Sequence, residues 1–297
     1  SRPSTKTRLK VLPTITDVLN KTLNSSIISD SERAHQHKKL YAHPPILDVK
    51  NVSKIYFGKA SLFKKPEEFK AVDNVSFKVF EGETLGLVGE SGCGKSTLSN
   101  VILQLDKATS GSIFYKGEDI TKLNSEAVRQ LRKDIQIIFQ DPFASLNPRL
   151  SVGEAILEPM KVHGIGNSKI ERKERVISLM ERVGLTPNDF NKYPHQFSGG
   201  QRQRIGIARA IALNPKLIIC DESVSALDIS VQAQVLNLLN ELKEKFNFTY
   251  IFISHDLAVV KYMSDQLIVM HQGKIEEIGE ADTILSEPTT SYTKKLI

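Results

Sequence analysis

The chain has 297 residues, of which 40% are hydrophobic, and this is enough apolar material for one large or two ordinary folded domains. Lysine and arginine number 40 against 34 acidic residues, and the resulting net charge of +6 does not by itself indicate nucleic acid. The only two cysteines, Cys93 and Cys220, exclude a disulfide framework, so we expect a reducing, cytoplasmic setting. No apolar stretch reaches the roughly 18 residues of a membrane span.

The first 45 residues differ in composition from the rest of the chain. Serine, threonine, lysine and asparagine are frequent there, and residues 34–39 form a polar run. Such a composition favours a linker or a loosely packed extension, residues 1–45, in which we expect one short helix near residues 15–23. The folded domain is then expected over residues 46–297.

Two stretches that alternate apolar and polar residues follow, at residues 46–52 and 71–79. This period predicts two strands, and therefore a β-rich edge to the fold. Tyr56 lies between them and is followed by a lysine-rich insertion, residues 59–70. An aromatic residue that ends a strand near a nucleotide site can stack on adenine, but most such residues belong to the core, so Tyr56 alone leaves both interpretations open.

Residues 89–96, GESGCGKS, match the pattern of a glycine, four residues and Gly-Lys-Ser. A strand-like run, residues 84–88, precedes them and a helical stretch, residues 97–105, follows. Backbone N–H groups in such a loop can surround a polyphosphate, Lys95 can reach its β and γ phosphates, and the Ser96 hydroxyl can ligate Mg²⁺. The helix N-terminus also favours an anion. A chance glycine turn is the alternative, and the flanking strand and helix argue against it.

Another strand-like run, residues 135–139, ends at Gln140. Open α/β sheets bind ligands at the carboxyl ends of their strands, so Gln140 is well placed to touch one. The following residues change to a charged, helical period with breaks at Gly164 and Pro187. We expect a separate helical subdomain over about residues 143–204.

Residues 198–201, SGGQ, open a predicted helix over residues 202–213. Two glycines and a serine at a helix start make a second terminus that suits an anion. The same tetrapeptide also suits a simple turn with an N-cap, and by itself it does not decide between the two interpretations.

A fully apolar run, residues 217–220, predicts a buried strand that delivers Asp221 and Glu222 to its tip. Paired carboxylates in this position hold Mg²⁺ in phosphate-loop ATPases, and the second carboxylate can polarise an attacking water. A solvated acidic turn is the alternative, and a phosphate loop in the same chain argues against it. A helix is expected next, over residues 230–245.

The next predicted strand, residues 249–253, is followed closely by His255. A histidine at this tip can hydrogen-bond a γ-phosphate, although a lone histidine is more often structural. Residues 266–270 and 274–278 then predict a final β pair with a turn at residues 272–273.

Together these motifs resemble, in order and approximate spacing, the nucleotide-binding subunits of ABC transporters, and the resemblance covers residues 46–297. The motifs are the phosphate loop, Gln140, residues 198–201, residues 217–222, residues 225–228 and His255. Six motifs in order are more specific than any one of them. The resemblance implies an α/β fold: a RecA-like phosphate-loop NTPase core with an antiparallel β subdomain and an inserted α-helical subdomain.

Within that family the chain is similar to the ATP-binding subunits of oligopeptide, dipeptide and nickel importers. The similar segments are residues 62–65 with 70–73, 139–149, 158–159 and 291–296. Ser223 departs from the family, which usually has proline after the carboxylate pair, and this change should loosen the turn without removing a ligand. In proteins with two fused cassettes, a C-terminal segment like residues 291–296 of this chain ends the first cassette. Residues 1–3 resemble the sequence that follows that segment, so we expect this chain to be the second cassette of a tandem protein.

The resemblance also implies a role for each matching residue. Catalysis is assigned to Glu222, as general base, and to His255, Lys95 and Gln140, while Mg²⁺ is assigned to Ser96, Gln140 and Asp221. Tyr56 is implied to stack on adenine. The other residues implied to contact ATP, on this cassette or on a second one, are Gly89, Glu90, Ser91, Gly92, Cys93, Gly94, Lys95, Ser96, Thr97, Gln140, His255, Ser198, Gly199, Gly200, Gln201 and Asp228.

The function implied is ATP binding and hydrolysis that power the import of oligopeptides or dipeptides. The implied partners are a second cassette in a head-to-tail dimer, transmembrane permease subunits and, indirectly, an extracytoplasmic solute-binding protein, with no nucleic acid. The chain would lie peripherally on the cytoplasmic face of the membrane. Two alternatives stay open: a soluble, non-transport ABC ATPase acting on ribosomes or DNA, and a cassette of another ABC transporter such as an exporter.

Overall fold

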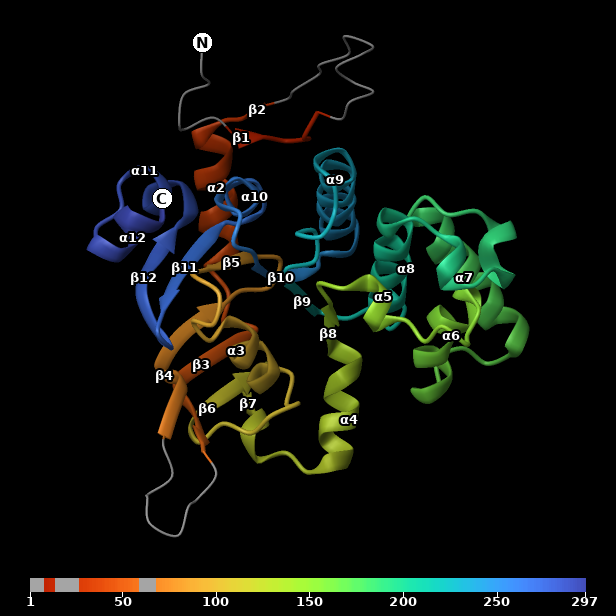
Figure 1. Ribbon diagram of the computed structural model, residues 1–297, viewed down its shortest axis with the longest axis horizontal. Coiled ribbons are helices and arrows are strands. Elements are labelled where there is room, and N and C mark those ends of the chain that lie inside the picture. Colours follow the sequence, from red (N-terminus) through yellow and green to blue (C-terminus); the bar gives the residue numbers. More distant parts are fainter. Residues whose placement is uncertain (1–7, 14–26, 59–67) are drawn as a thin grey trace. The chain divides into compact units, whose positions relative to one another are not determined.

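The structure is a computed structural model that describes residues 8–13, 27–58 and 68–297 (Figure 1). The chain separates into two compact units. Unit 1 comprises Ser29–Arg129 and Thr249–Ile297, with residue 8; unit 2 comprises Gln130–Phe248 and the described residues between 9 and 28. The helix predicted near residues 15–23 and the segment 62–65 lie outside the described residues.

Unit 1 contains four neighbouring strands in the order β12-β11-β5-β10. They are β5 (Thr84–Val88), β10 (Thr249–Ile253), β11 (Gln266–His271) and β12 (Lys274–Glu280). Both β10 and β11 run parallel to β5, and β12 is antiparallel to β11. Every residue of β5 and β10 is buried, as expected for parallel strands covered on both faces. The strands predicted at residues 84–88 and 249–253 and the predicted final β pair are confirmed.

A second sheet of unit 1 is antiparallel, in the order β4-β3-β6-β7. Its strands are β3 (Leu47–Phe57), β4 (Glu68–Val79), β6 (Ser110–Tyr115) and β7 (Glu118–Asp119). Leu47, Val49 and Val52 in the first half of β3 are buried and face a core, whereas Phe57 at its end is exposed. This sheet is the antiparallel β subdomain that the resemblance implies.

The helices of unit 1 include three near its C-terminus, α10, α11 and α12, that pack on strands β5, β11 and β12. The full set is α2 (Asp30–Leu40), α3 (Lys95–Ile102), the 3-10 helix η1 (Ile120–Lys122), α10 (Leu257–Met263), α11 (Ala281–Ser286) and α12 (Ser291–Leu296). Val260 of α10 and Ile284 of α11 share a buried cluster with Val88, the last residue of β5. Tyr292 and Leu296 of α12 pack against this cluster, so α12 lies close to the end of β5.

Helix α2 is not predicted by the sequence pattern. Ser29 caps it. Its Arg33 forms an ion pair with Asp282, and the Tyr41 hydroxyl just after it donates a hydrogen bond to Glu83 at 3.1 Å. Polar contacts hold this helix more than an apolar stripe does, which is why hydrophobic periodicity misses it. The boundary between an extension and a cassette near residue 45 stays a prediction.

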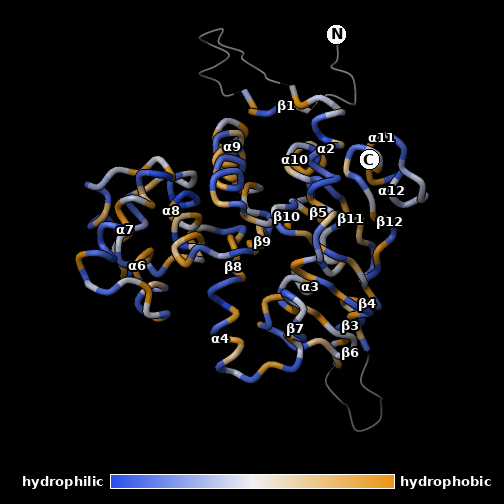
Figure 2. Tube along the Cα trace, turned by 180° about the vertical axis from the view of Figure 1, so that it is seen from behind, coloured by the Kyte–Doolittle hydropathy of each residue, from blue (hydrophilic) through white to orange (hydrophobic). Residues whose placement is uncertain are grey.

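Unit 2 is built around a parallel pair of strands. It contains β8 (Ile135–Ile138), β9 (Leu217–Asp221), α8 (Gly199–Ile211) and α9 (Ile229–Phe246). Ile138 lies opposite Cys220, so the two parallel strands end at the same edge. Hydrophobic and hydrophilic residues alternate in bands along α9 (Figure 2), and one set of its leucines is buried. The strand predicted at residues 217–220 and the helix predicted at residues 230–245 are confirmed.

The middle of unit 2 is helical. It contains α5 (Pro142–Ser145), α6 (Val152–Val162), α7 (Lys169–Arg182) and the 3-10 helices η2 (Pro187–Asn191) and η3 (Pro194–Gln196). Helix α6 packs against α7, η2 and α8, and Ile156, Met160 and Met180 are fully buried there. The limits of the predicted subdomain, about residues 143–204, stay a prediction.

Three short elements complete the described chain. They are α4 (Ser125–Asp134) and the two-stranded sheet of β1 (Arg8–Leu9) and β2 (Ile27–Ile28). Within unit 2, the backbone of Leu12 exchanges two 2.9 Å hydrogen bonds with the Asn237 amide of α9. Among the residues that the structure describes, no helix combines the length and the apolar character needed to cross a membrane.

Candidate functional site

The loop between β5 and α3 depends on two glycines. Gly89 has φ +151° and Gly94 has φ +109°, both in the region that favours glycine. A Cβ atom on Gly94 would lie 2.1 Å from the Ala71 carbonyl oxygen, and one on Gly89 would lie 2.2 Å from that of Met270. No larger residue fits without moving the backbone, so the glycine pattern read from the sequence has a steric cause at both ends of the loop.

Lys95, the first residue of α3, is folded into this loop. Its ammonium group donates hydrogen bonds to the carbonyl oxygens of Gly89 at 2.8 Å and Glu90 at 3.0 Å, and the residue is only 5% exposed. The Ser96 side chain is exposed. Because the first N–H groups of a helix have no acceptor within it, the loop offers a cation and free donors together to an anion.

Two other segments of unit 1 hold the phosphate loop in place. In the turn between β11 and β12, the Gly273 N–H donates to the Cys93 carbonyl at 2.9 Å. From α12, the Tyr292 hydroxyl accepts a hydrogen bond from the Glu90 N–H at 3.3 Å, and its ring stacks on His271 with centroids 4.0 Å apart. The sequence singled out the tail at residues 291–296 only as a resemblance, and this contact was missed.

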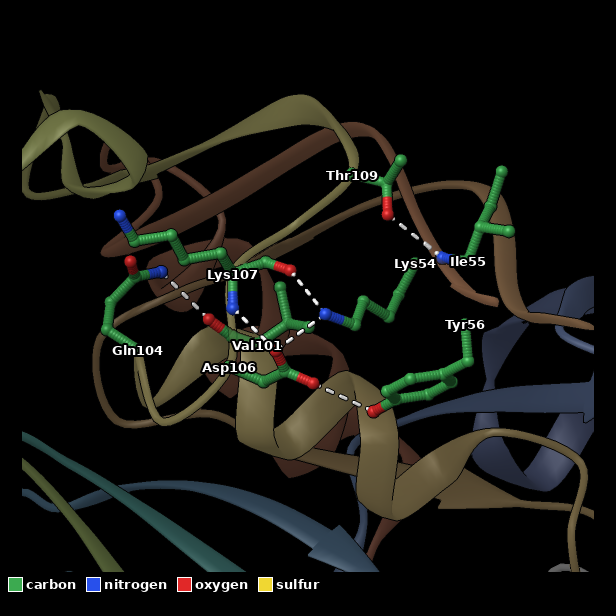
Figure 3. A network of polar contacts seen from close by, with 8 residues as sticks. All are labelled: Lys54, Ile55, Tyr56, Val101, Gln104, Asp106, Lys107 and Thr109. Carbon is green, nitrogen blue, oxygen red and sulfur yellow. Dashed lines mark hydrogen bonds and ion pairs between the residues drawn. The ribbon is translucent and has the colours of Figure 1, made fainter. Parts of the chain in front are cut away.

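Tyr56, near the end of β3, lies in the same unit as the phosphate loop. Its side chain is 41% exposed, so it is not a core residue. Its hydroxyl donates a hydrogen bond to Asp106, which follows α3, at 2.8 Å (Figure 3). The core interpretation of Tyr56 is therefore wrong. Asp106 gives no signal in the sequence, because it follows a helix outside any motif.

His255 follows β10, also in unit 1. The Ser254 N–H donates to the Leu87 carbonyl at 3.4 Å, which brings the tip of β10 beside the end of β5. Asp256 caps α10 by accepting from the Ala258 N–H at 2.8 Å. His255 is exposed at the same edge of the sheet from which the phosphate loop leaves.

In unit 2 the structure brings Gln140 and Glu222 together. The Gln140 side-chain amide donates to a Glu222 carboxylate oxygen at 3.1 Å, and Ser225 donates to the Glu222 carbonyl at 2.9 Å. Glu222 has φ +46°, a left-handed conformation that costs a non-glycine residue on the order of 1–3 kcal/mol. A strained residue whose carboxylate is oriented by an amide is typical of a functional position. Asp221 ends β9 beside it and is half-buried.

The serine-glycine segment forms the start of α8 in unit 2. Ser198 is the N-cap: its hydroxyl accepts from the Gln201 N–H at 3.3 Å, and the Gln201 side chain accepts from the Ser198 N–H at 3.0 Å. A Cβ atom on Gly200 would lie 2.3 Å from Val231 of α9, so this glycine allows close helix packing. Asp228 caps α9 through the Val231 N–H at 3.0 Å. The N-cap interpretation is confirmed, and Ser198 and Gly199 are still exposed.

The described residues do not form a metal site from histidine, cysteine and carboxylate side chains alone. In residues 8–13, 27–58 and 68–297, no three histidine, cysteine, aspartate or glutamate side chains are placed to hold an ion. The oxygen ligands predicted for Mg²⁺ come from Ser96, Gln140 and Asp221. A hydroxyl, an amide and a carboxylate suit Mg²⁺, which usually takes one or two carboxylates plus phosphate oxygens. Cys93 and Cys220 are free thiols and buried, and burial raises the pKa of Cys220.

Comparison with known proteins extends this description. The family described as ABC transporter matches residues 72–225. The oligopeptide transport ATP-binding protein OppF of Salmonella typhimurium is 51% identical over 252 residues, which cover 85% of this chain and 75% of that protein. The oligopeptide transport ATP-binding protein AppF of Bacillus subtilis is 52% identical over 254 residues, covering 85% of this chain and 77% of that protein.

A solved structure agrees with these sequence matches. The dimeric ATP-binding cassette MJ0796, bound to ADP and Pi in a post-hydrolysis state, is 32% identical, with a TM-score of 0.70. The match covers 79% of this chain and 98% of that one. The predicted phosphate-loop α/β fold is thereby confirmed. The family match spans more than half of the chain, and relatives are 51% and 52% identical to it over 85% of its length, so the chain belongs to the ABC transporter family.

Proposed function

We propose that this chain is the ATP-binding and ATP-hydrolysing subunit of an ABC importer, which takes up oligopeptides or dipeptides through a separate permease. Two oligopeptide transport ATP-binding proteins, 51% and 52% identical over 85% of the chain, support the importer. The observation that carries the ATPase is the closed glycine loop, in which Lys95 bonds the carbonyls of Gly89 and Glu90 at the start of α3. A soluble ATPase acting on ribosomes or DNA is not favoured, because these relatives are transport proteins. An exporter cassette is not favoured, because residues 139–149 resemble the peptide importers.

The residues of unit 1 bind the nucleotide. On ATP binding, Lys95 exchanges two loop carbonyls for the β and γ phosphates, and the N–H groups of residues 89–97 surround them. Tyr56 stacks on the adenine, and His255 contacts the γ-phosphate. The exposed side chain of Tyr56, in the same unit as the phosphate loop, supports the first of these roles.

The residues of unit 2 act on hydrolysis. Glu222 takes a proton from the attacking water, and the amide of Gln140 holds its carboxylate for that role, as the 3.1 Å hydrogen bond between them suggests. Gln140 and Asp221, together with Ser96 of unit 1, would hold Mg²⁺, which would supply positive charge to the transferring phosphoryl group. Ser198, Gly199, Gly200, Gln201 and Asp228 serve the nucleotide of a second cassette.

The partners follow from this division of roles. One chain supplies only part of each nucleotide site, so a second cassette, a copy or a relative, must face it head to tail. The helical subdomain, about residues 143–204, transmits closure to the permease, and a solute-binding protein delivers the peptide. The chain lies peripherally on the cytoplasmic face of the membrane and contacts it through the permease.

Replacement of the proposed general base tests the hydrolysis step. In Glu222→Gln the amide cannot accept the proton, so we expect kcat for ATP to fall by about 100-fold or more while ATP affinity stays within a few-fold. Turnover is measured as phosphate release, and affinity by titration with a fluorescent nucleotide. Full hydrolysis by this variant would remove Glu222 from its role.

A second measurement tests the importer itself. The tagged chain, isolated from its own cells in detergent, should co-purify with a membrane permease and a second cassette. Recovery with ribosomal particles instead would support the soluble ATPase and overturn the proposal.

A further inference from the structure

Tyr56 is held by a polar network on the surface of the antiparallel sheet (Figure 3). Its hydroxyl donates to Asp106 Oδ2 at 2.8 Å, while Lys54 of the same strand donates to Asp106 Oδ1 at 2.5 Å. The Lys54 ammonium also donates to the Lys107 carbonyl at 2.9 Å. One carboxylate therefore joins two side chains of β3 to the segment that follows α3.

The acceptor in this network is rigidly placed. The Asp106 N–H donates to the Asn100 carbonyl at 3.2 Å, and the neighbouring Leu105 N–H donates to the same oxygen at 2.9 Å. The Asp106 carboxylate also accepts from the Lys107 N–H at 2.9 Å. Its position is thus fixed by the end of α3, the helix that starts with Lys95.

The charges suit a strong hydrogen bond. The hydrogen bond from Lys54 lowers the pKa of Asp106, so the carboxylate is ionised at neutral pH. Burial and the bond to Asp106 raise the pKa of Tyr56, so the phenol keeps its proton and acts as donor. Hydrogen bonds to an ionised acceptor are shorter and stronger than neutral ones.

The network also leaves part of the ring available. The Lys54 ammonium lies over the Tyr56 ring, 4.9 Å from its centroid, and so covers one face. The side chain is nevertheless 41% exposed, whereas the Lys54 side chain is only 12% exposed. Strand geometry alone would leave the Tyr56 ring free to rotate. The Lys54 ammonium on one face and the Asp106 carboxylate on the hydroxyl together fix the plane of the ring.

We propose that Asp106, itself held by Lys54, is a positioning residue that fixes the Tyr56 ring for stacking on the adenine of ATP. The inference rests on the proposed function, in which Tyr56 stacks on the base. A ring that is already ordered loses little freedom when the nucleotide arrives, and this preorganisation raises affinity for the base alone. The phosphates, which the glycine loop binds, gain nothing from it.

The test compares ATP with inorganic tripolyphosphate, which has phosphates but no base, on the full-length chain. We expect Asp106→Ala and Tyr56→Phe each to weaken ATP binding by about 3- to 10-fold, as for the loss of one hydrogen bond to a charged group. The double variant should be no weaker than Asp106→Ala, because both remove one interaction. In Asp106→Ala, tripolyphosphate affinity and kcat at saturating ATP should not change, so the loss appears in KM.

Asp119 provides a matched control in the same sheet. It forms an ion pair with Lys122 at 2.8 Å, and this lysine lowers its pKa as Lys54 lowers that of Asp106, but its carboxylate accepts from Thr121 rather than from Tyr56. Asp119→Ala should leave the ratio of ATP to tripolyphosphate affinity at the wild-type value. Asp106→Asn, whose amide oxygen still accepts from Tyr56, should recover part of the loss.

The outcomes distinguish a failure of the positioning role of Asp106 from a failure of adenine stacking by Tyr56, on which that role rests. Tyr56→Ala with an unchanged affinity ratio would remove stacking itself. A lower ratio in Tyr56→Ala but not in Asp106→Ala would overturn the positioning role alone. Asp106→Ala could also lower the affinities for ATP and tripolyphosphate equally. The network would then support the phosphate loop and not the base, and the positioning role would again be overturned.

Discussion

The phosphate loop of unit 1 and the carboxylate turn of unit 2, residues 221–222, are held by different means. The loop is held mainly at its backbone: its glycines are left-handed, a neighbouring segment bonds its carbonyls, and the side chains of Lys95 and Tyr292 bond its backbone groups. The turn is held by side chains, since Gln140 and Ser225 bond Glu222, whose own backbone is strained. Changes in the loop are therefore expected to act through steric fit and on binding, and changes in the turn through orientation and on rate.

The largest effect is expected from filling the loop. In Gly94→Ala the new methyl group would meet the Ala71 carbonyl at 2.1 Å in a backbone with φ +109°, so the loop must move. We expect ATP affinity to fall by about 100-fold or more, with no comparable change at the Glu222 turn. Calorimetric titration measures the affinity, and a thermal melt shows whether unit 1 still folds.

Gly92 is the matched control for Gly94. It has φ +81°, but no atom lies within 4 Å of a Cβ placed there. Gly92→Ala should introduce only the strain of a left-handed alanine, about 1–2 kcal/mol. We therefore expect its ATP affinity to fall by about 10-fold. Equal losses in the two variants would mean that backbone conformation, and not the contact with Ala71, limits the loop.

The next largest effect tests the turn. Gln140→Ala removes the donor at 3.1 Å from the Glu222 carboxylate, so we expect kcat to fall by about 10-fold with a smaller change in affinity. Gln136 on β8, four residues before Gln140, donates to the Arg132 carbonyl instead and is the matched control. Steady-state kinetics separate kcat from KM, and a loss confined to KM in Gln140→Ala would break the contrast between loop and turn.

Much of the fold could be predicted because its signals are local. The strands at residues 84–88 and 249–253 are apolar runs that end at polar tips, and burial of every residue explains why they lack alternation. The glycine loop was equally clear, since its pattern spans eight neighbouring residues. The family resemblance then supplied the arrangement of the layers.

The contacts that orient the site were not predictable, because they join residues far apart in the sequence. Gln140 and Glu222 are 82 residues apart, Tyr56 and Asp106 are 50 apart, and Glu90 and Tyr292 are 202 apart. No periodicity reports such pairs. The roles assigned to the site residues as a set stay predictions, and the experiments here test them individually.

A smaller effect is expected where the tail meets the loop. Tyr292→Phe removes only the hydroxyl that accepts from the Glu90 N–H, so we expect ATP affinity to fall by about 2- to 5-fold. The stack on His271 should survive, and the melting temperature should change little. Tyr41→Phe is the control, because that hydroxyl bonds Glu83 away from the loop. Equal losses of affinity in both variants would exclude a specific role for the tail.

The smallest expected effect is a gain in stability. It tests whether replacing a glycine is harmful only in the phosphate loop. Gly206 lies inside α8 with no left-handed φ and no atom within 4 Å of a Cβ placed there. Because alanine restricts the unfolded chain and favours a helix, Gly206→Ala should raise the free energy of unfolding by about 0.5–1 kcal/mol. Chemical denaturation measures this, and ATP affinity should stay at the wild-type value. A loss of ATP binding in this variant would mean that glycine replacement is harmful wherever it occurs, and the steric account of the phosphate loop would then fail.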